Sequence, residues 1–284
     1  MAIFTNQATL SYNNTITTSN IVTGEVLEVL SATKNSLDSQ YRYGDTVTYV
    51  ISINNTGITA FNNLTITDDL GAYTVGGITA TPLTYEADTV AYYVNGVLQA
   101  TPTVTAGPPL VISGINVPAG GNAIIIYEAR VNQYAPLAVG STIVNNVEIS
   151  GSGLTTPIEV TDTVTVAEEA TLSITKSLSP ETVAENGQLT YTFTIQNIGN
   201  IPAVATDNVT ITDVFNPILD NITVTLNGTV LTTPAQYAYD EATGVFQTVA
   251  GVITVPAATF TQDPITGQWN IVPGVAVLSV TGTV

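Results

Sequence analysis

The chain of 284 residues contains the same long stretch twice, and this internal repeat restricts the fold more than any other feature. Tyr49 lies 15 residues after Lys34, and Tyr191 lies 15 residues after Lys176. The next shared glycine follows the tyrosine by 8 residues in both copies. Two equal spacings indicate two copies of one domain. The segments that match include Ala32-Thr-Lys34 with Ile174-Thr-Lys176, Asn55-Thr-Gly57 with Asn197-Ile-Gly199, and Ile66-Thr-Asp68 with Ile211-Thr-Asp213.

Short alternating segments fill both copies. Between clusters of Gly, Pro and Asn, most runs are rich in Val, Ile, Thr and Tyr and alternate polar with apolar residues. Such runs, about eight to twelve residues apart, are typical of an antiparallel β-sandwich. Asn95-Gly96 and Asn227-Gly228 suit the two positive φ angles of a type I′ hairpin turn. No segment has a convincing helical period, so we expect an all-β chain of two tandem immunoglobulin-like (Ig-like) β-sandwich domains.

The second copy lacks a final strand that the first copy has. Residues 121–131 align with residues 274–284, but only the first copy continues, into residues 141–150. Residues 4–11 can be laid on residues 143–150, with Asn6 on Asn145 and apolar residues at the same alternate positions. We therefore expect an N-terminal donor strand or hairpin (1–28), a complete first sandwich (29–166) and an open second sandwich (167–284).

An open sandwich exposes a strand edge and an apolar groove, which proteins rarely leave uncovered. If the N-terminal strand of the next subunit fills this groove, donor and acceptor lie at opposite ends of the chain. The contact then propagates into a head-to-tail homopolymer. The alternative is that the strand folds back into the second domain of its own molecule. The intervening domain favours exchange between subunits.

Strand parity places polar side chains among apolar ones on the inward faces, because successive residues of a strand alternate between faces. The only two lysines of the chain occupy the same register in the two copies. One aspartate and one asparagine per core share that inward parity. The predicted sets are Lys34, Asp68 and Asn145 in the first domain, and Lys176, Asp213 and the donor strand's Asn6 in the second.

Such a set can form a covalent bond. Burial lowers the pKa of a lysine and raises that of an aspartic acid until a neutral amine faces a neutral acid. The amine can attack the asparagine carboxamide, while the acid hydrogen-bonds the amide oxygen and relays a proton to departing ammonia. The expected products are a Lys34–Asn145 isopeptide bond within the chain, assisted by Asp68, and a Lys176–Asn6 bond between subunits, assisted by Asp213. The alternative is a buried Lys–Asp ion pair with Asn as a hydrogen-bonding neighbour.

Composition excludes most other chemistry. The chain has no Cys and no His, so disulfides, thiol nucleophiles and imidazole bases are absent. A net charge of −18 opposes binding to nucleic acid or to an anionic membrane. No acid pair converges on one face, so we expect neither a turnover enzyme nor a cofactor or metal site. The N-terminus lacks the basic and apolar regions of a signal peptide, and no stretch is as long as a membrane helix.

The shared segments resemble a known family. The lysine motif, Gly44–Tyr49, Asn55-Thr-Gly57, Ile66-Thr-Asp68 and Val144–Val147 are similar to the repeated domain of Gram-positive surface proteins called domain of unknown function family eleven. The resemblance covers residues 29–284 and weakens at Asn186, which stands where the first copy has Gly44. The whole chain also resembles the major subunits of clostridial spore appendages. The resemblance implies an Ig-like sandwich, a surface role and, in some such domains, isopeptide bonds.

We therefore predict a structural subunit that assembles head to tail by strand donation into a resistant fibre. Its expected place is the cell or spore surface, with assembly in the mother cell and without a signal peptide. The alternative is a surface adhesin whose loops bind a receptor and whose terminal strands only complete the fold. The single tryptophan, Trp269, is expected to pack on its own sheet.

Overall fold

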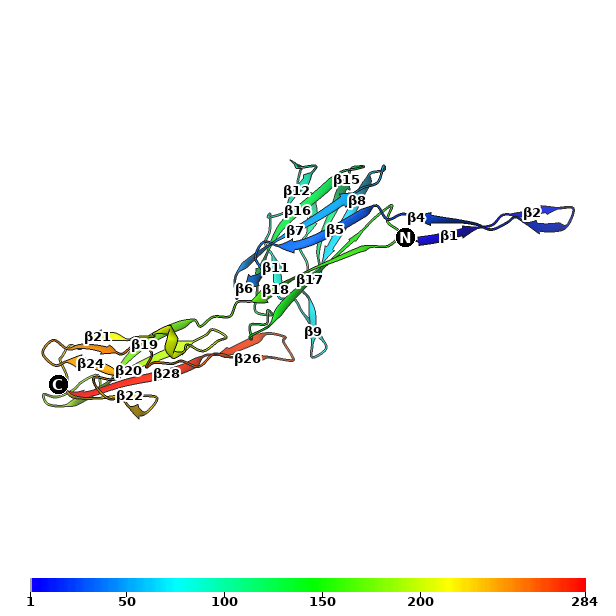
Figure 1. The fold of residues 1–284 in the computed structure, drawn as a ribbon. Helices are drawn as coiled ribbons and strands as arrows, with labels where there is room; N and C mark the ends of the chain where they lie inside the picture. Colours follow the sequence, from blue (N-terminus) through cyan, green and yellow to red (C-terminus); the bar gives the residue numbers. More distant parts are fainter. Residues whose placement is uncertain (1) are drawn as a thin grey trace.

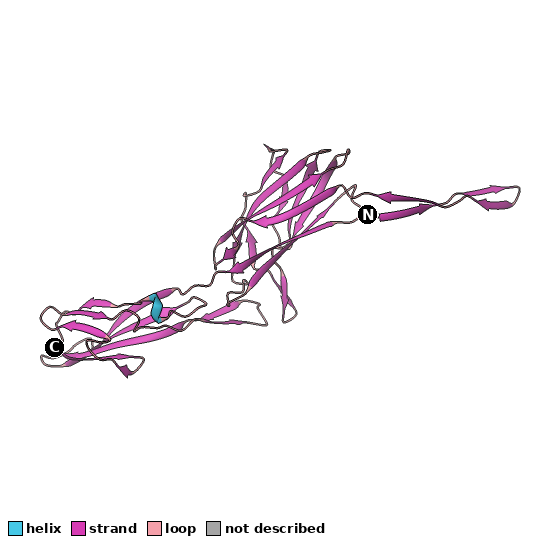
Figure 2. Ribbon diagram, viewed as in Figure 1, coloured by secondary structure: helices cyan, strands magenta, loops and turns pink. Residues whose placement is uncertain are grey.

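The computed structural model describes residues 2–284, which form an almost entirely β chain with two separate hydrophobic cores (Figures 1 and 2). Buried residues of the first core lie between Leu30 and Val166, and those of the second between Leu189 and Val280. An N-terminal arm extends from the first domain away from the second (Figure 1). The only helix among the described residues is a 3-10 turn, Ala205–Asp207 (η1). The expected all-β class is confirmed.

The first domain is a sandwich of two sheets, each of six strands. Inward residues alternate with outward ones along the longest strands, as the sequence pattern predicts. One sheet has the order β13-β12-β16-β7-β5, with β11 also on β16: Val97–Leu98, Ala91–Val94, Asn122–Val131, Thr46–Asn55, Leu30–Ser36 and Leu83–Tyr85. The other has the order β14-β15-β8-β17-β18-β6: Thr103–Thr105, Leu110–Val117, Phe61–Asp68, Thr142–Ser150, Ile158–Val166 and Gln40–Tyr41.

The antiparallel pair β17 and β18 closes the first sandwich. β17 pairs with β8 through Val147 and Asp68, and β18 pairs with β17 on its other side. β18 also packs against β5 of the opposite sheet. The apolar face of β5 is therefore covered, and Leu30 and Lys34 are buried.

The second domain has a full first sheet but only a fragment of the second. The five-stranded sheet has the order β19-β20-β28-β22-β23: Leu172–Ser179, Gln188–Asn197, Gly274–Thr283, Asp220–Leu226 and Thr229–Val230. The facing sheet has three strands in the order β21-β25-β24: Thr212–Val214, Val245–Thr248 and Tyr237–Asp240. Among the described residues, no strand pairs with the outer edge of β21, where β17 flanks β8 in the first domain. In the part of the chain that the structure describes, the second sandwich has no equivalent of the β17–β18 pair, where the sequence predicts one missing strand.

The N-terminal arm is a long two-stranded hairpin, one of the two forms expected for residues 1–28. β1 (Ala2–Asn6) pairs with β4 (Val22–Val26), and β2 (Thr9–Tyr12) pairs with β3 (Thr15–Thr18). Its tip turns at Asn13 and Asn14, whose φ angles of 44° and 59° are both positive, as in a type I′ turn. The arm thus has the same topology as the β17–β18 pair.

The backbone angles at one turn explain why the second copy can replace a glycine of the first with asparagine. Gly44 has a φ of 83°, and Asn186, which replaces it, has a φ of 59°. Their backbone N–H groups donate to equivalent carbonyls, that of Val131 at 3.1 Å and that of Val284 at 3.0 Å. Asparagine tolerates the left-handed region better than other side-chain-bearing residues, so the domain keeps this turn without glycine. The Asn-Gly turns predicted at Asn95 and Asn227 are also present.

Trp269, which was expected to pack on its own sheet, also makes a hydrogen bond to the other domain. Trp269 lies in the hairpin of β26 (Thr259–Gln262) and β27 (Trp269–Val272), and its Nε1 donates to the Tyr73 hydroxyl at 3.2 Å. Tyr73 belongs to the first domain, in the hairpin of β9 (Tyr73–Val75) and β10 (Ile78–Ala80). The tryptophan therefore helps to hold the two domains together.

Candidate functional site

The first domain brings all three predicted residues into its core. Lys34 lies on β5, Asp68 ends β8 and Asn145 lies on β17, and these side chains are 4%, 0% and 0% exposed. Lys34 Nζ donates to Asp68 Oδ2 at 2.9 Å and to the backbone oxygen of Asn145 at 3.2 Å. The three positions, far apart in sequence, meet because β5 and the β8–β17 pair face each other across the sandwich.

Two tyrosines that sequence reasoning missed surround this lysine. The Tyr127 hydroxyl donates to Asp68 Oδ2, and the Tyr49 ring stacks on Tyr127 with centroids 5.5 Å apart. Lys34 Nζ lies 4.7 Å from the centroid of the Tyr49 ring. Asp68 Oδ1 also accepts from the backbone N–H of Leu70 at 2.7 Å. The carboxyl group is therefore held by three donors, in one fixed orientation.

The environment favours the neutral amine. Burial lowers the pKa of Lys34, and the charges of Asp68, Asp69 and Asp162 oppose this shift only in part. Burial also raises the pKa of Tyr127, so its phenol stays protonated and remains a donor. A lysine with a lowered pKa, beside a carboxyl group that can take its proton, is an accessible nucleophile.

The oxygen of the Asn145 carboxamide is held by a backbone group, and the contacts of Asp68 are with other residues. Asn145 Oδ1 accepts from the N–H of Gly71 at 3.1 Å, whereas Asp68 bonds to Lys34, Tyr127 and Leu70. Gly71 has a φ of 71°, and a Cβ there would lie 2.6 Å from Ile143 Cγ2. Only glycine fits this turn. Its N–H, aimed at the amide oxygen, can stabilise negative charge that develops there.

One atom of Asn145 is left without a hydrogen bond. Nδ2 is buried and makes no hydrogen bond of ordinary geometry, and the same holds for the hydroxyl of Tyr49. The Asn145 side chain nevertheless lies near enough to the Tyr49 and Tyr127 hydroxyls to oppose in part the rise in their pKa values. A buried amide nitrogen without a partner is destabilising. Nδ2 is also the atom that departs as ammonia if Lys34 acylates itself on this side chain, so bond formation would remove the unsatisfied group.

The second domain assembles only part of its predicted set. Lys176 on β19 contacts Asp213 on β21, but these side chains are 39% and 19% exposed. The Lys176 Nζ lies 4.3 Å from the centroid of the Tyr191 ring. Asn6 lies exposed in the arm, opposite Val22, and a single copy does not bring it to Lys176.

An exposed apolar strip surrounds this half-built site. All eight residues of β19 are exposed, and Leu172, Ile174 and Leu178 are large hydrophobic side chains among them. In the first domain the corresponding strand β5 is covered by β18. We call the surface formed by β19 and the free edge of β21 the open groove.

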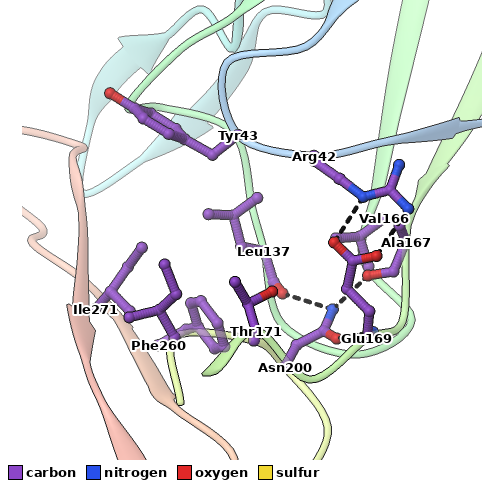
Figure 3. Close-up of a pocket in the computed structure, with 12 residues that line it drawn as sticks. Arg42, Tyr43, Leu137, Val166, Ala167, Glu169, Thr171, Asn200, Phe260 and Ile271 are labelled. Atoms are coloured by element: carbon purple, nitrogen blue, oxygen red, sulfur yellow. Dashed lines mark hydrogen bonds and ion pairs between the residues drawn. The ribbon is translucent and has the colours of Figure 1, made fainter. Parts of the chain in front are cut away.

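A cleft of about 250 Å³ lies at the junction of the two domains (Figure 3). Arg42 in its wall donates to both oxygens of Glu169, through Nε at 2.6 Å and Nη2 at 2.7 Å. The guanidinium lowers the pKa of Glu169. Asn200 donates to the backbone oxygens of Leu137 and Ala167, which also ties the domains together. The polar groups of the cleft are thus engaged with one another and serve the junction.

The described residues contain no cluster of three or more metal-binding His, Cys, Asp or Glu side chains. They also contain no helix of the length and apolarity needed to cross a membrane. The fold and the lysine sites together define a two-domain β protein with one closed sandwich, one open sandwich and a projecting hairpin.

No family model matches this chain, and no curated protein matches it. Similar solved structures include the pilus backbone RrgB of Streptococcus pneumoniae, at 14% identity and a TM-score of 0.36 over 86% of this chain and 55% of that one. BcpA, the major pilin subunit of Bacillus cereus, matches at 12% identity and a TM-score of 0.37 over 96% and 73%. A collagen-binding domain from a Staphylococcus aureus adhesin matches at 16% identity and a TM-score of 0.31 over 51% and 100%. At these scores the likeness identifies no activity.

Proposed function

We propose that this protein is a structural subunit that assembles head to tail into a surface fibre, with the arm of one copy filling the open groove of the next. The observation that carries the proposal is the pairing of an exposed two-stranded hairpin at one end of the chain with a sandwich that lacks an equivalent hairpin at the other. Donor and acceptor on opposite ends make a contact that repeats without closing on itself. We place the fibre on the cell or spore surface, in line with the resemblance to family eleven and to clostridial spore appendages.

The register of the first domain supports a specific seating of the arm. β17 pairs with β8 so that Val147 lies opposite Asp68. By the alignment of the arm with β17, Ala8 takes the place of Val147 and lies opposite Asp213. Asn6 then takes the place of Asn145 and faces Lys176, with Phe4 and Leu10 directed into the open groove. The second strand of the arm covers β19 as β18 covers β5.

The same seating completes the chemistry. A proton passes from the Lys34 ammonium to Asp68, and the neutral amine attacks Cγ of Asn145. A second proton then moves from the attacking Nζ to Nδ2, and the C–Nδ2 bond breaks to release ammonia. Lysine and asparagine thereby become one amide, with no oxidant and no cofactor. The Lys176, Asp213 and Asn6 set repeats this between subunits once the arm excludes water. A chain without cysteine gains covalent linkage by this route.

The first test compares the full chain with a variant that lacks residues 2–12. Concentrated protein is examined by electron microscopy and on boiled denaturing gels, and junction peptides are sought by mass spectrometry. We expect fibres and a ladder whose junction peptide joins Lys176 to Asn6 with loss of ammonia, and only monomers from the deletion. As a control, Asn6→Ala should assemble but dissociate on boiling.

Two results would contradict parts of this proposal. Monomers at every concentration from the full chain would refute assembly and favour the adhesin alternative, in which the loops bind a receptor and the arm serves its own molecule. Fibres that dissociate on boiling, with no ammonia lost at Lys34, would leave assembly standing but show that the lysines form ion pairs only.

A further inference from the structure

Asp162 lies on β18 directly opposite Asn145 of β17. Opposite residues of an antiparallel pair share one face of the sheet, with their Cβ atoms about 4.5–5.5 Å apart. That face is the inward one, because Val160, Val164 and Asp162 have the same parity and Val164 is buried. β18 packs against β5, the strand of Lys34, and the charge of Asp162 acts on that lysine. Asp162 therefore faces both reacting side chains.

The Oδ2 atom of Asp162 is buried and has no hydrogen-bond partner. The Nδ2 atom of Asn145, on the residue opposite, is buried without a partner too. A buried carboxylate oxygen with a free lone pair is unfavourable, and native structures rarely keep one without a reason. Asp68, by contrast, is already bonded to Lys34, Tyr127 and Leu70. Two unpaired acceptors thus remain around the leaving group, the Tyr49 hydroxyl and Asp162 Oδ2. Burial raises the pKa of Tyr49 and keeps its phenol protonated, so the carboxylate of Asp162 is the one that can accept a further proton.

We propose that Asp162 carries the proton from the attacking nitrogen of Lys34 to the departing nitrogen of Asn145. This rests on the proposed function and assigns one step of it. Asp68 takes the first proton, which turns the ammonium into an amine. When Nζ bonds to Cγ, it must lose a second proton, and Nδ2 must gain one before the C–N bond can break. Asp162 Oδ2 accepts this second proton and passes it to Nδ2, so ammonia leaves and Asp162 returns to its starting form.

The arm lacks this group. Its residue opposite Asn6, in the same register as Asp162 opposite Asn145, is Val22. Proton transfer by a positioned acid or base contributes about 10²–10⁴-fold to a rate. The bond between subunits, which has no such group, therefore forms more slowly than the bond within the first domain. A slow second bond lets a mis-seated arm leave before it is fixed.

The test measures bond formation during cell-free synthesis of the full chain, by mass spectrometry at successive times. Asp162→Asn should slow the loss of ammonia at Lys34 at least tenfold, whereas Glu159→Gln, the same charge change on the exposed face of β18, should not. A bond that forms in Asp162→Asn within twofold of the wild-type rate overturns this proposal alone. Absence of the bond in the wild type overturns the proposed covalent function together with it.

A second variant covers the case in which Asp162→Asn fails to fold. Val22 is exposed in the arm, so Val22→Asp leaves both domains intact. We expect it to accelerate the Lys176–Asn6 bond at least threefold. Seating of the Val22→Asp arm is checked separately in a chain that also carries Lys176→Met, where fibres form without covalent bonds. An arm that seats normally but links at the wild-type rate or more slowly contradicts the role of Asp162.

Discussion

The two domains carry a lysine at the same strand position, yet Lys34 is sealed in a core and Lys176 lies against solvent. The sheets that bear these lysines are alike, and each lysine contacts an aspartate and an aromatic ring. What differs is the closing pair of strands, present as β17–β18 in one domain and missing from the other. Burial of a lysine is therefore a property of the completed sandwich. Under the proposed assembly, the second domain supplies Lys176 and Asp213 of a reactive site, and the arm supplies Asn6.

The largest expected effect comes from a charge placed in the open groove. Ile174 is 53% exposed, so Ile174→Asp should leave the monomer's stability nearly unchanged. A seated arm would bury that carboxylate without a partner, which is strongly unfavourable. We expect complete loss of fibres in electron microscopy and in light scattering. The matched control is Ile265→Asp, at an 82% exposed position of the β26–β27 hairpin, which should assemble normally.

The second prediction compares how much each of the two lysines contributes to the free energy of unfolding. In the Asn145→Ala background, where no isopeptide bond can form, Lys34→Met leaves Asp68 buried without its lysine partner, and breaking a buried pair in this way costs about 3–5 kcal/mol. Lys176→Met removes an exposed partner, and we expect a change within about 1 kcal/mol in the monomer. Thermal unfolding of both variants, each lacking residues 2–12 to prevent assembly, measures the difference. Equal losses of unfolding free energy in the two variants would show that the two lysine sites are equivalent before assembly, contrary to the difference in burial described above.

The repeat and the strand parity predicted the sandwich, the missing strand and the inward direction of Lys34, Asp68 and Asn145. These features depend on the alternation of polar and apolar residues along each strand, which can be read directly from the sequence. Tyr127 was missed because its aligned position in the second copy is Val280, so the repeat gives no hint of a shared hydroxyl. Gly71 was missed because its role depends on a turn that brings its N–H to Asn145 across the sheet.

The sequence left open whether the arm is a strand or a hairpin, for another reason. The alignment stopped at Ser150, although residues 15–26 can follow residues 4–11 as β18 follows β17. The alternation of polar and apolar residues along a strand does not show which other strand it pairs with. The same limit hid Asp162, whose importance lies in the residue opposite it. The pairing of strands that are distant in sequence is thus the part of this site that the sequence alone did not predict.

The third prediction concerns pH. Only the neutral amine attacks, and burial lowers the pKa of Lys34, so bond formation in the first domain should accelerate with rising pH and level off below the ordinary lysine value of 10.5. The charges of Asp68, Asp69 and Asp162 act on Lys34, and the phenols of Tyr49 and Tyr127 lie beside this lysine and its carboxylate partner. Cell-free synthesis followed by transfer to buffers of different pH measures the rate. A rate that falls as pH rises would contradict a neutral nucleophile.

A variant that cannot form the isopeptide bond tests the lowered pKa of Lys34 through the free energy of unfolding. In Asn145→Ala, the folded state holds its Lys34 proton less tightly than the unfolded chain does, because the folded pKa is the lower one. Between that lowered pKa and 10.5 the unfolded chain binds more protons, so the free energy of unfolding rises with pH in this window. Adding Lys34→Met should remove the slope. A slope that survives this second change belongs to other groups.

The smallest expected effect tests whether the two domains behave as one rod. The Tyr73 hydroxyl donates to the Tyr134 oxygen at 2.6 Å and accepts from Gln262 at 2.6 Å and from Trp269 at 3.2 Å. Tyr73→Phe leaves the two donors of the second domain without this acceptor, a loss of about 1–3 kcal/mol at the junction. Neither core loses a contact, so small-angle scattering should show a wider range of domain angles with little change in either melting transition. Tyr43→Phe, an exposed tyrosine at the same junction, is the control. An unchanged scattering curve would assign the rigidity to Arg42 and Glu169, and a fibre would then keep its stiffness without Tyr73.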